Sequence, residues 1–276
     1  MSKRSVLPGL GLSLGFTTAY LGLVVLFPLS ALFGAAANGG WTAFADILRA
    51  PRVLAACRLT LVTSLVAAGL NAVFGVLVAW VLVRYRFPGR RLVDAMVDLP
   101  FALPTAVAGI ALTTLYAPGG WLGAALARVG VTVAFTPAGI TVALMFVGLP
   151  FVVRAVQPVL QDLEPELEEV AASLGASPGQ VVLRVIGPTM LPAILTGFTL
   201  AFARGLGEYG SVVFIAGNMP MRTEVAPLLI MAKLEQFDYP GAAAIGAVLL
   251  LASFTMLLAI NLLQVAARRR LADGEE

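Results

Sequence analysis

Six long apolar runs dominate this chain and limit the folds that it can adopt. A helix needs about 20 mostly apolar residues to cross a bilayer, because the hydrocarbon core is about 30 Å thick and a helix rises about 1.5 Å per residue. The runs that qualify are residues 10–33, 59–83, 93–116, 139–160, 191–215 and 241–266. Charged residues make up only 12% of the chain, whereas a soluble domain usually carries about 25%. The sequence therefore predicts an all-α membrane protein with about six transmembrane helices in a lipid bilayer.

The composition also excludes common catalytic sites. The chain has no histidine and a single cysteine, Cys57, so a His/Cys zinc site, a Ser-His-Asp triad and an internal disulfide are impossible. An intramembrane enzyme would need another convergent set, such as paired aspartates. Asp94 and Asp98 share one helix face, but the sequence places nothing else beside them. We therefore expect no catalytic residue, no metal site and no cofactor bound by this chain.

Basic residues predict how the spans are oriented. Those that flank alternate spans are Lys3, Arg4, Arg84, Arg86, Arg90, Arg91, Arg154, Arg184, Arg268, Arg269 and Arg270. All of them fall on one side if both termini are cytoplasmic, as the positive-inside rule requires. The bias is imperfect, because the opposite loops hold Arg49, Arg52, Arg128, Arg222 and Lys233. We interpret the net charge of +3 as a topology signal and expect no nucleic-acid partner.

The first apolar run allows one alternative. It ends near Ala35 and Ala37, which fit the A-x-A cleavage site of a signal peptide. The run is longer than the apolar part of a typical signal, so we favour a retained span. On the opposite side of the membrane, helical apolar spacing predicts two further short helices, over residues 41–54 and 223–237.

The longest inner loop, about residues 162–190, begins with the signals of a short helix. Pro165 suits the first helical position because it has no N–H to leave unpaired. Acidic residues follow near the positive end of the helix dipole. Gly175 then stands where a left-handed residue is expected to end the helix.

A second helix is expected directly after this glycine. Ser177 and Gln180 have the spacing of a capping box, with Pro178 at the first helical position. Gly187 and Pro188 are expected to end this helix. The loop is therefore predicted to form two short helices around a glycine turn, outside the membrane.

The loop resembles the EAA loop of bacterial ABC importer permeases. The motif of that loop is E-A-A followed by three residues and G, and then by nine residues, I, one residue and L-P. Glu169, Ala171, Gly175 and Pro188 match this spacing. The chain differs from the motif at three positions: Val170 replaces Ala, Val185 replaces Ile and Gly187 replaces Leu. The resemblance implies a type-1 ABC importer permease fold. It also implies that the two loop helices insert into a cleft of a separate cytoplasmic ATPase.

The sequence agrees that the ATPase is a separate chain. A Walker A motif needs Gly-Lys followed by Ser or Thr. The only lysines are Lys3 and Lys233, and neither follows glycine. The resemblance therefore implies a transport subunit that is not an enzyme, with ATP and Mg used by the partner ATPase.

Further segments resemble sulfate and molybdate permeases. They are Arg58-Leu-Thr-Leu, Asn71, Phe74-Gly75, Arg84-Tyr-Arg-Phe-Pro-Gly, and residues 99–109 and 148–154. Residues 205–227 look most like a sulfate/thiosulfate permease subunit, since molybdate permeases share the Gly-Glu-aromatic-Gly core but usually differ after the Asn at position 218. The implied function is to form the translocation path for sulfate or thiosulfate across the bacterial inner membrane.

Three alternatives stay open. The first is a molybdate or tungstate ABC permease. The second is a secondary anion carrier without an ATPase, which would leave the EAA-like loop unexplained. The third is a purely structural membrane partner.

The resemblance also implies an assembly and a division of the chain. Its partners would be two copies of the ATPase, a second permease subunit that is a paralogue in the family pattern, and a periplasmic sulfate-binding protein that selects the anion. Residues 1–56 would form an N-terminal transmembrane helix and a periplasmic loop. Residues 57–266 would form the permease core, and residues 267–276 a cytoplasmic tail.

Span five carries the first candidates for the translocation path. Gly205, Gly207 and Gly210 formally fit a dinucleotide fingerprint, but that motif needs a preceding strand. We interpret these glycines as places of close helix approach or bending. Intramembrane charges face the protein interior or a water-filled cavity. Arg204 and Glu208 are therefore either a gate on the anion path or a self-neutralising pair, which we favour because Glu208 would repel sulfate. Ser211 completes this group of candidates.

Span three carries the remaining candidates. Pro100 and Pro104, with Thr105 and Gly109, are expected to break its backbone. Freed carbonyls and the Thr105 hydroxyl would line a pore, or the break would be a kink for packing.

Overall fold

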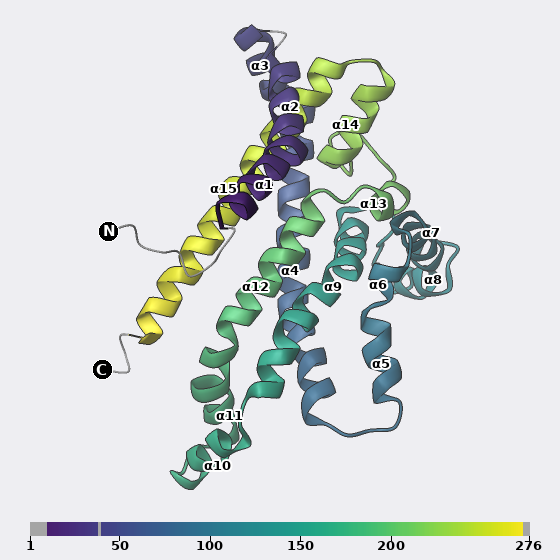
Figure 1. The fold of residues 1–276 in the computed structure, drawn as a ribbon. Coiled ribbons are helices and arrows are strands. Elements are labelled where there is room, and N and C mark those ends of the chain that lie inside the picture. Colours follow the sequence, from purple (N-terminus) through teal and green to yellow (C-terminus); the bar gives the residue numbers. More distant parts are fainter. Residues whose placement is uncertain (1–9, 38–39, 273–276) are drawn as a thin grey trace, which may run out of the picture.

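The computed structural model describes residues 10–37 and 40–272, and in that part of the chain it contains helices and loops but no strand (Figure 1). Five of its helices are long and apolar enough to cross a membrane, or six if one bent pair of helices counts as a span. The five are Leu10–Ala37, Pro51–Arg84, Pro137–Asp162, Pro178–Leu206 and Tyr239–Leu262, and the bent pair is Thr105–Tyr116 with Trp121–Ala127. The all-α class with about six spans is confirmed.

The first span is one apolar helix with a π turn inside it. It consists of α1 (Leu10–Leu21), the π-helical η1 (Gly22–Leu26) and α2 (Phe27–Ala37), and α2 packs against the last helix, α15 (Tyr239–Ala272). The expected helix over residues 41–54 is divided between α3 (Gly40–Arg49) and α4 (Pro51–Arg84). Pro51 explains the division, because proline cannot continue a helix by donating an N–H but suits the first position of the next one.

Three helices form the centre of the molecule. α4, α9 (Pro137–Asp162) and α12 (Gly187–Leu206) pack along one another. A Cβ atom added to Gly197 of α12 would stand 2.7 Å from the Cα of Val152 in α9. One added to Gly75 of α4 would stand 2.7 Å from Cγ1 of the same valine. Small residues therefore let all three backbones approach closely, as at many helix contacts in membranes.

Span three is broken, as its prolines predict, but its bounds differ from the expected run over residues 93–116. The chain instead forms α5 (Arg90–Val97), α6 (Leu99–Ala102), α7 (Thr105–Tyr116) and α8 (Trp121–Ala127), with a bend of 44° between α7 and α8. The break expected from the prolines is confirmed at Leu103 and Pro104, whose ψ angles are 134° and 131°. Pro104 causes it, because the residue before a proline is pushed out of the helical region.

The second helix of the inner loop does not end at Gly187 and Pro188, and that expectation is wrong. α10 (Pro165–Ser173) and α11 (Pro178–Val181) form as expected, but α11 continues through the π-helical η2 (Val182–Ile186) into α12. The N–H of Gly187 donates to the carbonyl of Val182, five residues back. This wider turn leaves room for the ring of Pro188, which otherwise clashes with the preceding turn.

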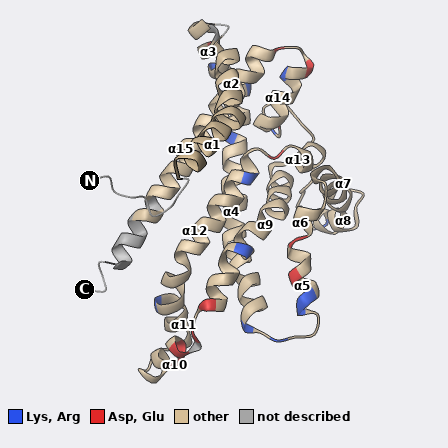
Figure 2. Cartoon of the chain, in the orientation of Figure 1, with Lys and Arg blue, Asp and Glu red and all other residues tan. Residues whose placement is uncertain are grey.

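Span five therefore runs over Pro178–Leu206 rather than residues 191–215. Residues 207–209 interrupt the helix, and α13 (Gly210–Ile215) follows. The outer helix expected over residues 223–237 is α14 (Ala226–Glu235), which packs against α15 and α4. Figure 1 shows α10 and α11 at one end of the molecule and α3 and α14 at the other. Figure 2 shows long uncharged stretches between these ends, including residues 239–265 of α15.

We predict that Gly197→Ala destabilises the central helices. Its new methyl group meets the α9 backbone, so the helices must separate, and overpacking of this kind costs about 1–3 kcal/mol. The midpoint of thermal unfolding in detergent should fall by roughly 5 °C. Gly69→Ala in α4 is the matched control, because its added Cβ has no atom within 4 Å. Equal midpoints for the two variants would contradict the close packing.

Candidate functional site

The α10–α11 helix pair turns on Gly175. This residue has φ +86°, which L-residues with a side chain rarely adopt. The N–H of Gly175 donates to the carbonyl of Ala172 at 2.9 Å, and the N–H of Ala176 donates to that of Ala171 at 3.0 Å. The left-handed helix end expected at Gly175 is confirmed.

The start of α11 is stabilised as expected. The backbone N–H of Ser177 donates to Oε1 of Gln180 at 2.8 Å, within a complete capping box. Pro178 occupies the first turn. The capping box and the glycine turn together give the α10–α11 pair a defined shape outside the central helices.

The α10–α11 pair exposes apolar side chains. Leu167 and Val170 are exposed, and Leu174 is 83% exposed. Beside them lies an open cavity of about 420 Å³ lined by Ala171, Leu174, Gly175, Ala176, Gln180, Arg184 and Val185. Glu169 is exposed on the same helix, whereas Pro188 lies in α12. A protruding apolar surface rimmed by charge is typical of a protein interaction site.

The candidates from spans three and five lie together. α7, which begins at Thr105 after Pro104, packs against α13. A Cβ atom on Gly210 would stand 2.2 Å from the Thr105 hydroxyl, and one on Gly109 would stand 2.6 Å from the carbonyl oxygen of Ser211. The two broken spans therefore meet at their breaks, through glycines.

Arg204 and Glu208 form an ion pair at the end of α12. Arg204 Nη1 lies 2.6 Å from Oε2 of Glu208, whose side chain is 1% exposed, while that of Arg204 is 36% exposed. The other carboxylate oxygen, Oε1, accepts hydrogen bonds from the N–H and the hydroxyl of Ser211, both at 2.9 Å. Gly207 lies between the two charged residues in the sequence, and a Cβ atom added to it would have no atom within 4 Å. The carboxylate is thus enclosed by protein donors, and the guanidinium remains accessible.

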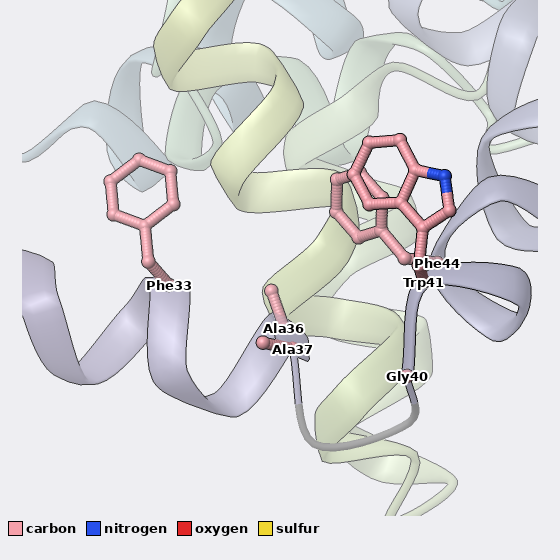
Figure 3. A pocket seen from close by; sticks show the side chains of 6 residues that line it. All are labelled: Phe33, Ala36, Ala37, Gly40, Trp41 and Phe44. Carbon is pink, nitrogen blue, oxygen red and sulfur yellow. The ribbon is translucent and has the colours of Figure 1, made fainter.

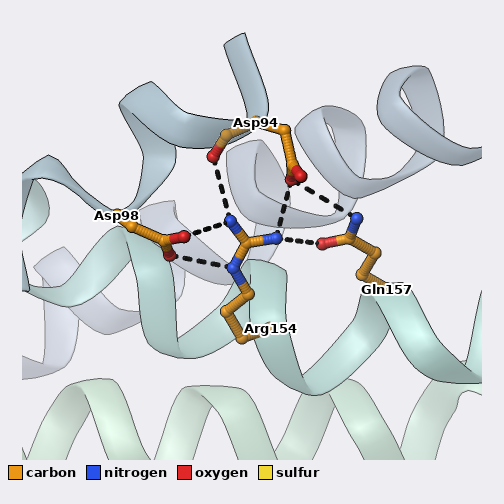
Figure 4. Close-up of polar contacts among 4 residues, drawn as sticks. All are labelled: Asp94, Asp98, Arg154 and Gln157. Atoms are coloured by element: carbon orange, nitrogen blue, oxygen red, sulfur yellow. Dashed lines mark hydrogen bonds and ion pairs between the residues drawn. The ribbon is translucent and has the colours of Figure 1, made fainter. Parts of the chain in front are cut away.

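A charged cluster between spans three and four was missed from the sequence (Figure 4). Arg154 of α9 donates through Nε to Asp98 Oδ1 at 2.9 Å and through Nη2 to Asp98 Oδ2 at 2.6 Å. Its Nη1 donates to Asp94 Oδ1 at 2.7 Å and to Gln157 Oε1 at 2.5 Å, and its Nη2 donates to the carbonyl of Asp94 at 2.9 Å. The expectation that nothing joins the two aspartates is wrong. The spacing of the two aspartates on one helix face could have indicated a shared site. The sequence carried no signal that their partner, Arg154, lies in a different span.

A second missed pair lies at the α14 end of α4. Arg52 donates to both carboxylate oxygens of Glu224, each at 2.7 Å, and the Glu224 side chain is 1% exposed. Eight residues further along α4, the Thr60 hydroxyl accepts the N–H of Ala226 at 2.8 Å. These bonds fix the loop before α14 to the first turns of α4.

Buried polar atoms without a hydrogen-bond partner among the described residues also lie on α4. They are the Ser64 hydroxyl, the amide group of Asn71 and, at the last residue of the helix, Arg84 Nε. The same helix face carries Thr60, so one side of α4 is polar where it enters the helix core.

The remaining features carry no comparable chemistry. Among residues 10–37 and 40–272, no group of three or more His, Cys, Asp or Glu is placed to hold a metal ion. An apolar pocket of about 310 Å³ lies where α2 turns towards α3, lined by Phe33, Ala36, Ala37, Gly40, Trp41 and Phe44 (Figure 3). Its lining has no titratable group, and Trp41 and Phe44 stack with ring centroids 5.7 Å apart.

The fold and the exposed helix pair define the membrane-spanning subunit of a transporter. Residues 71–273 match the family model described as binding-protein-dependent transport system inner membrane component, and the chain belongs to that family. It is 49% identical to the sulfate transport system permease protein CysT of Escherichia coli K12 over 98% of both chains. It is 53% identical to the probable sulfate transport system permease protein cysT of Nephroselmis olivacea, over 92% of this chain and 89% of that one.

Solved structures share the fold at low sequence identity. A chain of a bacterial ABC transporter involved in the import of the acidic polysaccharide alginate superposes with a TM-score of 0.74 at 19% identity, over 93% of this chain and 95% of that one. A chain of the MetNI methionine ABC transporter superposes with a TM-score of 0.59, also at 19% identity, over 78% of this chain and 95% of that one. The type-1 ABC importer permease fold is confirmed.

We predict that Arg204→Leu reduces the amount of folded protein more than the double variant Arg204→Leu/Glu208→Gln. The single change leaves a buried carboxylate without its cation, at an expected cost of about 2 kcal/mol, below that of a fully buried pair because Arg204 is partly exposed. Folded protein in membranes and anion uptake should be measured together.

The control for this experiment is Arg128→Leu, which removes an exposed arginine. Equal protein levels in the single and double variants would contradict a structural pair, and loss of uptake at a normal protein level would show that Arg204 acts on the transport path as well.

Proposed function

We propose that this chain is a permease subunit of an ATP-driven importer and forms part of the translocation path for sulfate or thiosulfate across the bacterial inner membrane. The observation that carries the proposal is the exposed α10–α11 pair, with its left-handed glycine turn and the spacing of the EAA motif. The names of the relatives support sulfate as the anion. Molybdate or tungstate would be the competing cargo.

The α10–α11 pair would dock with a cytoplasmic ATPase, present in two copies, that uses ATP and Mg. Leu167, Val170 and Leu174 offer the apolar part of this surface, and Glu169 offers a charge. Exposed leucines at a helix pair outside the membrane are stabilised when a partner covers them. A second, paralogous permease subunit and a periplasmic sulfate-binding protein would complete the importer.

The anion would pass near the breaks in spans three and five. Thr105 offers a hydroxyl group there, and glycines at positions 109 and 210 bring the two backbones together. The buried hydroxyl of Ser211 donates to Glu208 and would act on the path only through that carboxylate. Arg204 offers an accessible cation, while the charge of Glu208 is shielded by its own hydrogen bonds. An oxyanion is stabilised by such donors without being bound tightly by any one of them.

We predict that Gly175→Val separates ATPase binding from membrane insertion. A β-branched residue at φ +86° is strained by about 1 kcal/mol or more and should tilt α10 against α11. We expect normal amounts of the permease, weak co-purification of the ATPase and little sulfate uptake. Gly179→Val in α11 is the matched control, because Gly179 is helical and has no atom within 4 Å of an added Cβ. Unchanged ATPase binding in Gly175→Val would remove the main support for the importer.

We also predict that the α10–α11 pair and both termini are cytoplasmic, because the basic clusters lie on that side. The test uses a Cys57→Ser background with single cysteines at Ser173 in α10 and at Gln236 after α14, both exposed. A membrane-impermeant maleimide added to intact cells should label the cysteine at 236 and should reach the one at 173 only after permeabilisation. Labelling at 173 in intact cells would reverse the topology.

A further inference from the structure

Arg84, the last residue of α4, links this helix to α10. Its Nη2 donates to Oε1 of Glu168, and its guanidinium lies 5.6 Å from the centroid of the Trp80 ring. The two paired side chains are 20% and 32% exposed. A charge-assisted hydrogen bond and a cation–π contact thus hold the same guanidinium, and both are strengthened when water is partly excluded.

Little else joins α10 to α4 in the described chain. An open groove of about 380 Å³ lies between them, lined by residues that include Trp80, Ala172 and Val181. Glu168 lines this groove, so its ion pair with Arg84 lies beside open space. Arg84 Nε is buried and makes no hydrogen bond to the described residues, so the guanidinium is not saturated in the way that Arg154 is. The contact therefore leaves α10 free to shift while the two helices stay connected.

The acidic residues of α10 differ in their surroundings. Glu168 is half-buried and paired with Arg84, whereas Glu166 and Glu169 are exposed and form no ion pair with the described residues. Both acids line the groove beside Trp80, but only Glu168 pairs with α4, so the exposed carboxylate of Glu169 remains available to a partner on this surface.

Movement that reaches α4 would pass to the rest of the subunit. α4 has 34 residues, about 51 Å at the helical rise, and it packs along α9 and α12. At its other end Arg52 forms the bidentate pair with Glu224, in the loop that follows α13. A displacement at Arg84 is thus carried by a continuous helix to the loop beside the break in span five.

We propose that Arg84 and Glu168 are positioning residues that transmit movement of α10 directly to α4, in addition to the path along the chain through α11 into α12. The inference rests on the proposed function, because it requires an ATPase that moves α10. In this proposal Glu168 transmits the movement of α10 to α4, and Glu169 contacts the ATPase.

The test uses the complete importer, with its ATPase and binding protein, in lipid vesicles. Arg84→Gln and Glu168→Gln should each keep normal ATPase co-purification but lower the sulfate transported per ATP hydrolysed by about tenfold, the effect of about 1.4 kcal/mol. Arg86→Gln and Glu166→Gln are matched controls, since each removes an exposed charge of the same sign nearby. Both controls should transport normally. The exchange Arg84→Glu/Glu168→Arg should restore most of the transport.

Three results would overturn the inference. An unchanged ratio of transport to ATP hydrolysis in both single variants would show that the pair transmits nothing. Loss of ATPase co-purification in parallel with transport would make the pair a docking element. Equal losses in the matched controls, or no recovery in the exchange variant, would show an effect of net charge alone. Failure of the proposed function is distinguishable, because the unmodified importer would then neither bind the ATPase nor take up sulfate.

Discussion

The close approach of α4, α9 and α12 is the contact on which the rest of this structure depends. In a bilayer the lipid tails are as apolar as the helix surfaces, so helices associate through close packing and hydrogen bonds rather than through exclusion from water. Gly75 and Gly197 bring α4 and α12 to the same valine of α9, Val152, which is fully buried. The three helices therefore form one body, and the other elements attach to it at its two ends and at the breaks in the spans.

Arginines make several of these attachments, and their bonding differs. Arg154 uses all three of its nitrogen atoms to bind two aspartates and a glutamine, so it fixes α5 against α9. Arg52 binds both oxygens of a buried carboxylate. Arg84 makes a single ion pair beside an open groove. A planar guanidinium has one preferred geometry when every donor is engaged, as in Arg154, or when two parallel donors meet one carboxylate, as in Arg52. The first two contacts are therefore rigid joints, and the single bond of Arg84 permits movement.

The sequence predicted what local chemistry determines. Apolar run length identified the spans, and Pro165, Gly175 and Ser177 identified the ends of the two loop helices. The sequence did not predict the features that contacts between distant segments determine. The helix across Gly187 and Pro188 is retained by a π turn and by packing of α12, and Ile186, beside this point, is almost fully buried. Arg154 is 56 and 60 residues from its two carboxylate partners, and no periodicity within one span indicates such a pairing. The candidate path residues were named from both spans, but their contact through glycines was visible only in three dimensions.

The breaks in spans three and five also bear on how an anion would meet Arg204 and Glu208. Irregular backbone at membrane depth is tolerated where it is buried in protein or lines a water-filled cavity, and here Glu208 itself receives the N–H and hydroxyl of Ser211 just after the break. With Arg204 on its other oxygen, the carboxylate has all-protein donors and almost no exposed surface. A buried, neutralised carboxylate exerts little repulsion on an ion that approaches from the exposed side of the guanidinium. In the proposed translocation path, a structural pair and a path-lining group would be compatible in one arrangement: Glu208 would orient Arg204 and stabilise the break, and the accessible face of Arg204 would supply the positive potential.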